Sequence, residues 1–230
     1  YVQTPSRSGA LGYARPGDII VLRGGAVWSD VGYGNRFVRF IGMTGSAPTG
    51  ATGTGPITII GYPGEDVRIR VPSNTSGGFH GVAGMEPQYQ HDSDWITIAN
   101  LRIEGGDMTV LDAPINLQAK SDHWRIINNE IFNWAAADGR RRDVKGKVIR
   151  EARAGGIVGN GSDIAILGNH IHHIDGGTLN HCIYLDTGAT DVEIAYNHIH
   201  HCNGGNIIQT FDNLGMGALK NIQIHHNLMH

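Results

Sequence analysis

Residues 183–202, IYLDTGATDVEIAYNHIHHC, decide the fold because their pattern occurs twice without a gap. The earlier copy is INLQAKSDHWRIINNEIFNW, residues 115–134. The matched positions are Ile115 with Ile183, Leu117 with Leu185, Trp124 with Val192, Ile126 with Ile194, Asn129 with Asn197 and Ile131 with Ile199. Self-similarity of this kind is typical of repeat architectures, in which stacked units bury a continuous core. We therefore expect a stack of similar coils.

Each repeat contains three short segments in which apolar and polar residues alternate, and a period of two indicates strands. The pattern recurs at 164–174 (IAILGNHIHHI) and at 222–230 (IQIHHNLMH). Residues 95–103 are a looser copy, and residues 57–69 fit an earlier coil. Three short strands per coil, with coils roughly 4.8 Å apart, predict an all-β fold, the right-handed parallel β-helix.

One asparagine recurs between the second and third segments, as Asn129, Asn169, Asn197 and Asn227, at spacings of 40, 28 and 30 residues. In the looser copy Leu101 takes its place. An inward amide at this bend can bond the coils above and below it and satisfy backbone groups. We interpret the column as part of the scaffold.

The composition fits one elongated domain, residues 1–230, with many turns, since it holds 34 glycines and only 18 Lys and Arg. The formal net charge of −3 argues against nucleic acid or a membrane as partner. No apolar run reaches the roughly 18–20 residues of a membrane span. Cys182 and Cys202 can either form a disulfide or remain buried thiols.

The segment GALGYARPGDIIVLRGGAVW, residues 9–28, resembles the N-terminal cap and first strand of pectate lyases and of the chondroitinase B and alginate lyase family. The matching residues are Ala14, Pro16, Gly17, Asp18, Ile20, Leu22 and Gly25. The later coils, with HCIYLDTG and VEIAYNHIHH, resemble the general repeat of such lyases. The resemblance implies a helical cap over residues 1–18, a secreted or cell-surface location, and a polysaccharide as substrate.

The outward residues of the first strands form a row that can floor a substrate groove. By the alignment this row holds Asn116 and Gln118, Val158 and Asn160, Tyr184 and Asp186, and Ile208 and Thr210. Its amides, phenol and carboxylate suit sugar hydroxyls. The alternative is an ordinary solvated sheet face.

The extra residues of the longest coil form a basic insertion, residues 135–155. Between 138 and 153 it holds seven cations and three acids, a local charge of +4. The cations are Arg140, Arg141, Arg142, Lys145, Lys147, Arg150 and Arg153. Long loops on regular scaffolds tend to carry function, and Arg grips carboxylates. We expect a uronate-containing polysaccharide as partner, the alternatives being a solvated loop or an inter-chain contact.

Cleavage of a uronate polymer by β-elimination needs a base, a group that neutralises the carboxylate, and an acid for the leaving oxygen. The resemblance implies a lysine base, an arginine and often Ca²⁺. Lys120 is the lysine nearest the row, although it also fits a solvated turn, and Arg150 or Arg153 can reach from the insertion. His181 and Tyr184 are alternative proton-transfer groups.

Two absences weaken the match to individual families. The chain lacks the R-x-P-x-x-R motif of pectate lyases and the clustered aspartates of polygalacturonases. Asp186 and Asp212 do not share a column, because Asp186 aligns with Thr210. The competing hypothesis is therefore a carbohydrate-binding or structural solenoid without catalysis.

Histidines form two outward columns on the third strand: His172, His200 and His230 above Phe132, and His170 with His198. We interpret them as stacked polar ladders and assign no metal, because no carboxylate recurs there to complete a ligand set.

The sequence stops in mid-coil at HHNLMH. An open coil edge is compatible with a fragment of a longer protein, with end-to-end self-association, or with a covering partner.

Overall fold

The fold was described from a computed structural model of the chain. It describes residues 14–25, 27–28, 36–40, 46–47, 54–70, 77–81, 93–105, 107–108, 113–117, 121–136, 140–142, 148–151, 155–175, 180–212 and 219–230. Throughout these ranges the regular structure is strand, without a helix. They accordingly contain no helix that could cross a membrane.

Nearly all strands belong to three parallel sheets. Sheet 1 contains β3 (Arg36–Phe40), β6 (Gly77–Gly81), β10 (Ile115–Leu117), β15 (Gly155–Gly159), β18 (His181–Leu185) and β21 (Ile208–Thr210). Sheet 2 contains β1 (Ile19–Leu22), β4 (Ile57–Gly61), β7 (Ile96–Ala99), β11 (Arg125–Ile127), β16 (Ser162–Leu167), β19 (Thr190–Ala195) and β22 (Lys220–His225). Sheet 3 contains β2 (Val27–Trp28), β5 (Arg68–Arg70), β8 (Arg102–Glu104), β12 (Glu130–Ala136), β17 (His170–Asp175), β20 (His198–Asn203) and β23 (Leu228–Met229). A short strand, β9 (Asp107–Met108), also pairs with β12.

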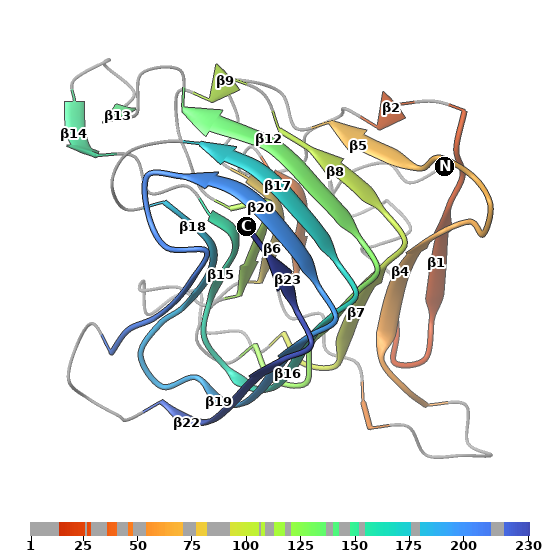
Figure 1. Cartoon of the computed structure of the whole chain (residues 1–230). Helices are drawn as coiled ribbons and strands as arrows, with labels where there is room; N and C mark the ends of the chain where they lie inside the picture. The colour runs from red at the N-terminus through yellow and green to blue at the C-terminus, as the bar shows by residue number, and fades with distance from the viewer. Residues whose placement is uncertain are drawn as a thin grey trace.

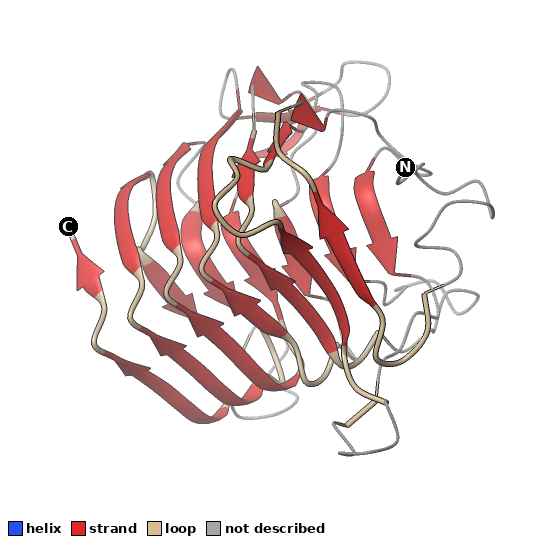
Figure 2. Cartoon of the chain, turned by 90° about the vertical axis from the view of Figure 1, so that its right-hand side faces the viewer, coloured by secondary structure: helices blue, strands red, loops and turns tan. Residues whose placement is uncertain are grey.

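The chain visits the three sheets in turn, as in the succession β18, β19 and β20. Each new strand pairs in parallel with the strand one coil earlier, so β18 follows β15 and β20 follows β17. Figures 1 and 2 show the resulting stack of coils from two directions. The predicted all-β parallel solenoid is therefore the arrangement observed.

The core lies between the sheets and is built from inward columns of apolar side chains. In sheet 2, Ile98, Ile126, Ile166 and Ile194 are paired in register and are all fully buried. Burial of one such side chain contributes about 1.5–3 kcal/mol. Because side chains alternate between the two faces of a strand, this column confirms the parity predicted from the repeat.

The asparagine column is also present and forms a hydrogen-bonded ladder. The Asn169 side chain donates to the carbonyl of Ile126 at 2.9 Å and to Asn197 Oδ1 at 3.0 Å. At the N-terminal end, the backbone N–H of Leu101 donates to Asn129 Oδ1 at 3.1 Å. Leu101 therefore occupies the column as predicted and ends the ladder.

The bend before the ladder has a left-handed residue in five successive coils, from β7 to β22. This position is filled by Asn100, Asn128, Gly168, Tyr196 and His226, with φ between 53° and 65°. Asparagine and glycine tolerate this conformation, whereas Tyr and His adopt it at a cost. The bend is therefore set by the coil and not by the residue that occupies it.

The N-terminal motif forms a turn followed by a strand. Pro16 and Gly17 lie in a turn closed by the Asp18 N–H, which donates to the Arg15 carbonyl at 3.0 Å, and Gly17 has φ 90°. Leu22 in β1 is buried, as the motif predicts. Of the helical cap expected over residues 1–18, residues 1–13 lie outside the described ranges, and residues 14–18 are not helical.

A disulfide joins Cys182, in β18, to Cys202, in β20, with their Cα atoms 5.7 Å apart. The bond connects the first and third strands of the same coil and closes that coil into a covalent ring. Of the two states that the sequence allowed for this pair, a disulfide or two buried thiols, the structure contains the disulfide.

Candidate functional site

The outer face of sheet 1 carries one continuous row of residues in parallel register. The row consists of Asn116, Val158, Tyr184 and Gln209, and the same backbone register continues to His80 in β6 and Arg39 in β3. Their neighbours Ile115, Ile157 and Ile183 are fully buried, so the row faces away from the core. The row predicted from the repeat is therefore present from Asn116 through Val158 to Tyr184.

The register positions of Arg39 and His80 were not predicted from the sequence, because β3 and β6 lie in coils that lack the asparagine of the repeat. The only signal was a cation or a histidine between residues of a short apolar run, as in Val38-Arg39-Phe40 and Phe79-His80.

One predicted alignment in this row is wrong. Tyr184 pairs with Gln209, and Thr210 pairs with Leu185, whereas the repeat placed Ile208 and Thr210 on the outer row. Ile207 and Ile208 are consecutive and both pack partly against the core, so apolar alternation does not fix the register here. The predicted alignment of Asp186 with Thr210 is wrong for the same reason, because Thr210 pairs with Leu185.

His181 and Tyr184 are the two titratable side chains that the structure brings together on this face. Their rings stack with centroids 5.4 Å apart and planes inclined by 17°. His181 Nδ1 accepts the backbone N–H of Asn206 at 3.0 Å. A neutral imidazole has one donor and one acceptor nitrogen, so the proton of neutral His181 lies on Nε2. This ring can therefore donate a hydrogen bond or a proton through Nε2.

The loop that holds His181 depends on a close backbone approach at Gly205. A Cβ at this position would lie 1.8 Å from the carbonyl oxygen of Asn180 and 2.9 Å from His181 Nδ1. Only glycine lets the 204–206 loop lie against the start of β18 and aim the Asn206 N–H at the imidazole. Asn206 also donates through its side chain to Gln209 Oε1, which links the loop to the row.

Asp186 lies just beyond β18 and serves a turn. Its Oδ1 accepts the backbone N–H of Thr187 at 2.7 Å and the Thr187 hydroxyl at 3.1 Å. The Thr187 carbonyl in turn accepts the Asn160 side chain at 2.8 Å. The carboxylate therefore orders the bend between sheets 1 and 2. Asn116, on β10, is only 6% exposed and offers little surface to a ligand.

The basic insertion contains an antiparallel pair of strands, β13 (Arg140–Arg142) and β14 (Val148–Glu151). Figure 1 shows the pair beyond the ends of β12 and β17, away from the body of the sheets. The chain leaves β14 and enters sheet 1 at Gly155, whose register partner is His181. The return strand of the insertion, which includes Arg150, is thus connected to the coil position beside His181.

Several predicted site residues lie outside the described ranges: Gln118, Lys120, Lys145, Lys147 and Arg153. Of the remaining predicted residues, His181 and Tyr184 form a pair, Asn116 and Asp186 lie elsewhere on the same face, and Arg140, Arg141, Arg142 and Arg150 lie in β13 and β14.

No family model, no curated protein and no solved structure matches the chain. The site therefore has to be interpreted from its own geometry.

Proposed function

We propose that the chain is a right-handed parallel β-helix with a helical N-terminal cap, and that it cleaves an acidic, uronate-containing polysaccharide by β-elimination. The substrate lies along the outer row of sheet 1. The single observation that carries the proposal is the register of Gly155 with His181, because it connects the end of a strongly basic insertion to the strand that pairs with the His181–Tyr184 strand.

Each chemical requirement has a candidate in this arrangement. A base removes the proton next to the uronate carboxylate, the electron pair forms the carbon–carbon double bond, and the bond to the leaving oxygen breaks. His181 supplies a proton from Nε2 to that oxygen. Tyr184 and Lys120 are the candidate bases, and Arg150 or Arg153 pairs with the carboxylate.

Ca²⁺, which the family resemblance implies, does not fit the described residues of sheet 1. Ca²⁺ takes six to eight oxygen ligands. The groups of three potential ligand side chains found among the described residues all lie on sheet 3 and contain at least two histidines each. We therefore assign no step to Ca²⁺.

The disulfide supports the cellular setting of the proposal. Disulfides persist in oxidising compartments and are rare in the cytosol. The bond between Cys182 and Cys202 is thus in keeping with a secreted or cell-surface protein.

The test is incubation with polygalacturonate, alginate and chondroitin sulfate, following the ultraviolet absorbance of the unsaturated product. We expect turnover on one of them, reduced roughly 10²- to 10⁴-fold in His181→Gln, as for loss of a general acid. Gln223→Ala, on the exposed face of sheet 2, is the control and should retain full activity. Absence of product from all three substrates with a folded protein would contradict the lyase proposal, and retention on a substrate column without product would favour the carbohydrate-binding solenoid.

A further inference from the structure

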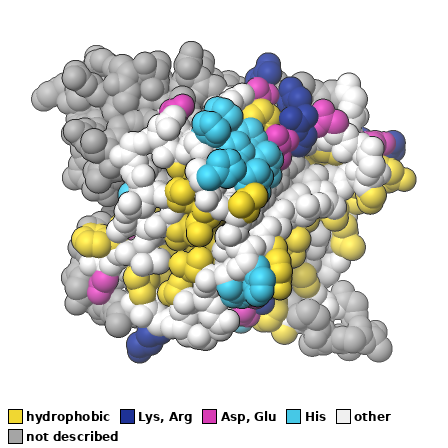
Figure 3. Space-filling model, viewed as in Figure 1, with side chains coloured by type: hydrophobic (Ala, Val, Ile, Leu, Met, Phe, Trp, Pro, Cys, Tyr) yellow, Lys and Arg dark blue, Asp and Glu magenta, His cyan; other side chains and the backbone are white. Residues whose placement is uncertain are grey.

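The outer face of sheet 3 carries a dense group of histidines, which we call the histidine face. It consists of His170, His172, His173, His198, His200, His201 and His230. Figure 3 shows a large patch of histidine side chains next to a group of charged side chains, and a smaller histidine group lower in the same view. The proposed lyase site on sheet 1 uses none of them.

The two columns predicted from the sequence are present. His170 stacks on His198 with ring centroids 4.8 Å apart and planes 4° from parallel, and His172 stacks on His200 at 5.1 Å and 6°. Phe132 lies below His172 with centroids 5.4 Å apart, as expected. Parallel register between β17 and β20 therefore brings four imidazoles together.

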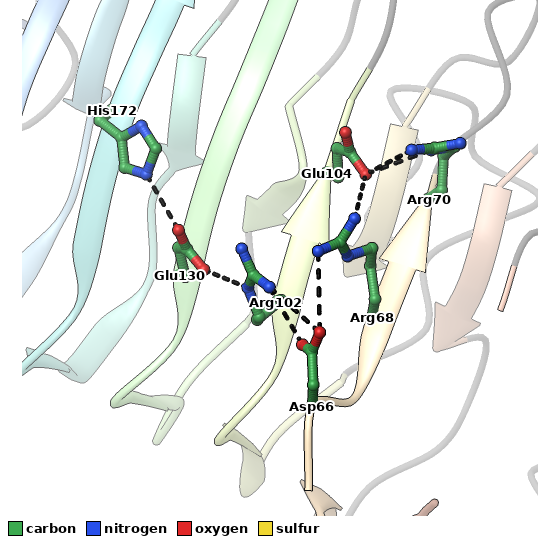
Figure 4. Close-up of polar contacts among 7 residues, drawn as sticks. All are labelled: Asp66, Arg68, Arg70, Arg102, Glu104, Glu130 and His172. Carbon is green, nitrogen blue, oxygen red and sulfur yellow. Dashed lines mark hydrogen bonds and ion pairs between the residues drawn. The ribbon is translucent and has the colours of Figure 1, made fainter. Parts of the chain in front are cut away.

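No carboxylate recurs along these columns, but a single one lies at their edge. Glu130 is the register partner of His170, and its Oε1 lies 3.2 Å from His172 Nε2. Glu130 is also held by Arg102, which reaches Asp66 at 3.2 Å. The network continues through Arg68, Glu104 and Arg70, as Figure 4 shows. The Glu130 carboxylate therefore contacts both Arg102 and His172, and it holds the His172 ring at the edge of the histidine face.

Three other histidines converge without a carboxylate. His170, His198 and His200 each place one ring nitrogen within 4.8 Å of the others, and the Nε2 atoms of His170 and His200 are 2.9 Å apart. Tetrahedral Zn²⁺ with Zn–N bonds of about 2.0–2.1 Å separates its ligand nitrogens by about 3.3 Å. The distance of 2.9 Å between the Nε2 atoms of His170 and His200 is close to that separation.

His198 supplies a second, independent observation. Its Nε2 is buried, yet it makes no hydrogen bond within the described part of the chain. Buried polar atoms are nearly always satisfied, so an orphaned ring nitrogen beside two other ring nitrogens points to a bound group. A cation that accepts nitrogen lone pairs satisfies all three rings at once.

We propose that His170, His198 and His200 form a site for a divalent transition-metal ion of the Zn²⁺ class, with water as the fourth ligand. Because His170 lies in β17 and the other two ligands lie in β20, the metal joins two successive coils.

The protonation state of the cluster favours metal binding. Burial, together with the charges of the neighbouring imidazoles, lowers the pKa of His170 and lowers the pKa of His200 to about 4, while Glu130 acts in the opposite direction on His170. The surrounding titratable groups are Glu130, His172, His173, His201 and His230. Neutral imidazole is the ligand form, so His170 and His200 release few protons on metal binding at neutral pH.

The ligand set also predicts selectivity. Imidazole nitrogens suit Zn²⁺, Cu²⁺ and Ni²⁺, whereas Ca²⁺ and Mg²⁺ require oxygen ligands. Zn²⁺ therefore binds in the presence of a large excess of Ca²⁺. This also distinguishes the site from the Ca²⁺ that the lyase resemblance implies.

The test is calorimetric titration of the untagged, disulfide-bonded protein with Zn²⁺, together with the visible spectrum of the Co²⁺-substituted form. We expect one ion per chain, and a loss of affinity of at least about tenfold in each of His170→Gln, His198→Gln and His200→Gln. Circular dichroism confirms that each variant is folded. A substitution that unfolds the protein is replaced by Asn at the same position.

The matched control is the double variant His173→Asn/His201→Asn. These two rings belong, with His200, to a neighbouring group of potential ligands. Our proposal requires the control to keep one Zn²⁺ per chain and to lose less affinity than each single ligand variant, because His201 contacts the ligand His200 without being a ligand itself. Loss of binding in the control with retention in His170→Gln would overturn the proposal, as would equal affinity in all variants or displacement of Zn²⁺ by Ca²⁺. None of these outcomes depends on polysaccharide cleavage, so the two proposals stand or fall separately.

Discussion

Asn197 Oδ1 accepts two hydrogen bonds from Asn169, one from its backbone N–H at 2.9 Å and one from its side chain at 3.0 Å. One amide oxygen on each coil therefore satisfies two donors on the coil before it. The same pair of contacts joins Asn129 to Asn169, so the ladder connects coils whose spacing in the sequence differs.

Asn169→Ala should destabilise the protein by about 3 kcal/mol or more, because it leaves the Ile126 carbonyl and the Asn129 N–H buried without partners, at about 1–3 kcal/mol each. Urea unfolding followed by circular dichroism measures the change. Asn227→Ala is the matched control and should cost less, since Asn227 is only partly buried. Equal losses in both variants would contradict a contribution that depends on burial.

Loss of the Cys182–Cys202 bond should lower the free energy of unfolding by about 3 kcal/mol, the value expected for a closed loop of this size, 20 residues. Thermal unfolding of Cys182→Ala/Cys202→Ala measures the effect, with the reduced wild type as a second comparison. A double variant as stable as the oxidised protein would show that the coil needs no covalent closure.

Tyr196→Asn should stabilise the protein by about 1 kcal/mol, because Tyr196 has φ 59° and asparagine adopts the left-handed conformation more readily. The side chain is 62% exposed, so little packing is lost. Tyr196→Phe, which keeps the same backbone cost, should leave the urea midpoint unchanged. A lower midpoint in Tyr196→Asn would mean that the contact of Tyr196 with His226 outweighs the backbone cost.

Acidification should destabilise the metal-free protein between about pH 6.5 and pH 4. Burial lowers the pKa of His170 and His172 and lowers the pKa of His200 from 6.5 to about 4, so the unfolded chain binds protons in this window that the folded chain does not. The contribution of these rings to stability is fully present above pH 6.5, the histidine pKa in the unfolded chain, and is lost as the rings of the folded protein become protonated. For Glu130, burial is outweighed by its hydrogen bonds to Arg102 and His172, which lower its pKa, so its contribution persists to lower pH.

The pH effect is measured by urea unfolding at pH 7.5 and pH 5 in the presence of EDTA. His200→Gln should show a smaller difference between the two conditions than the wild type. An unchanged difference would assign the acid sensitivity to groups outside the histidine face.

Replacing Arg140, Arg141 and Arg142 with Ser should weaken retention of the protein on immobilised polygalacturonate at low salt, because three cations are removed from the insertion. The difference should vanish at high salt, where exposed charges are screened. Arg23→Ser, which removes a cation paired with Glu65, is the control and should change retention little. Unchanged retention of the triple variant would remove the basic insertion from the proposed substrate site.

The repeat was readable from the sequence wherever each coil carries the asparagine and its flanking isoleucines, as in Ile126, Ile166 and Ile194. The sequence did not predict β3 and β6, whose coils lack the asparagine. It also did not predict the register of β21, because Ile207 and Ile208 are adjacent and both apolar. The histidine columns were predicted because parallel register repeats the same residue type from coil to coil. Their carboxylate was missed because Glu130 stands one coil before His170, in a column otherwise occupied by histidine.

The disulfide could not be derived from alternation. Residues 198, 200 and 202 are alternate residues of β20, and regular alternation would point all three side chains outward, Cys202 together with the histidines. His201 has φ 52°, however, and this left-handed residue reverses the alternation, so that Cys202 packs against the core. His173 has φ 53° and does the same for Ile174, which is fully buried. One residue with left-handed backbone in each strand thus turns the side chain that follows it into the interior.

The covalent ring between Cys182 and Cys202 has a mechanical consequence. A force that peels strands from β23 backward first releases the chain up to Cys202. It then acts through the disulfide on Cys182, because residues 183–201 are spanned by the bond and cannot extend. The pulling axis then passes directly from β20 to β18 and bypasses β19. In an optical-trap experiment, adding a reductant should lengthen the released chain by the contour of this hidden segment, and an unchanged length would show that the ring does not form in solution.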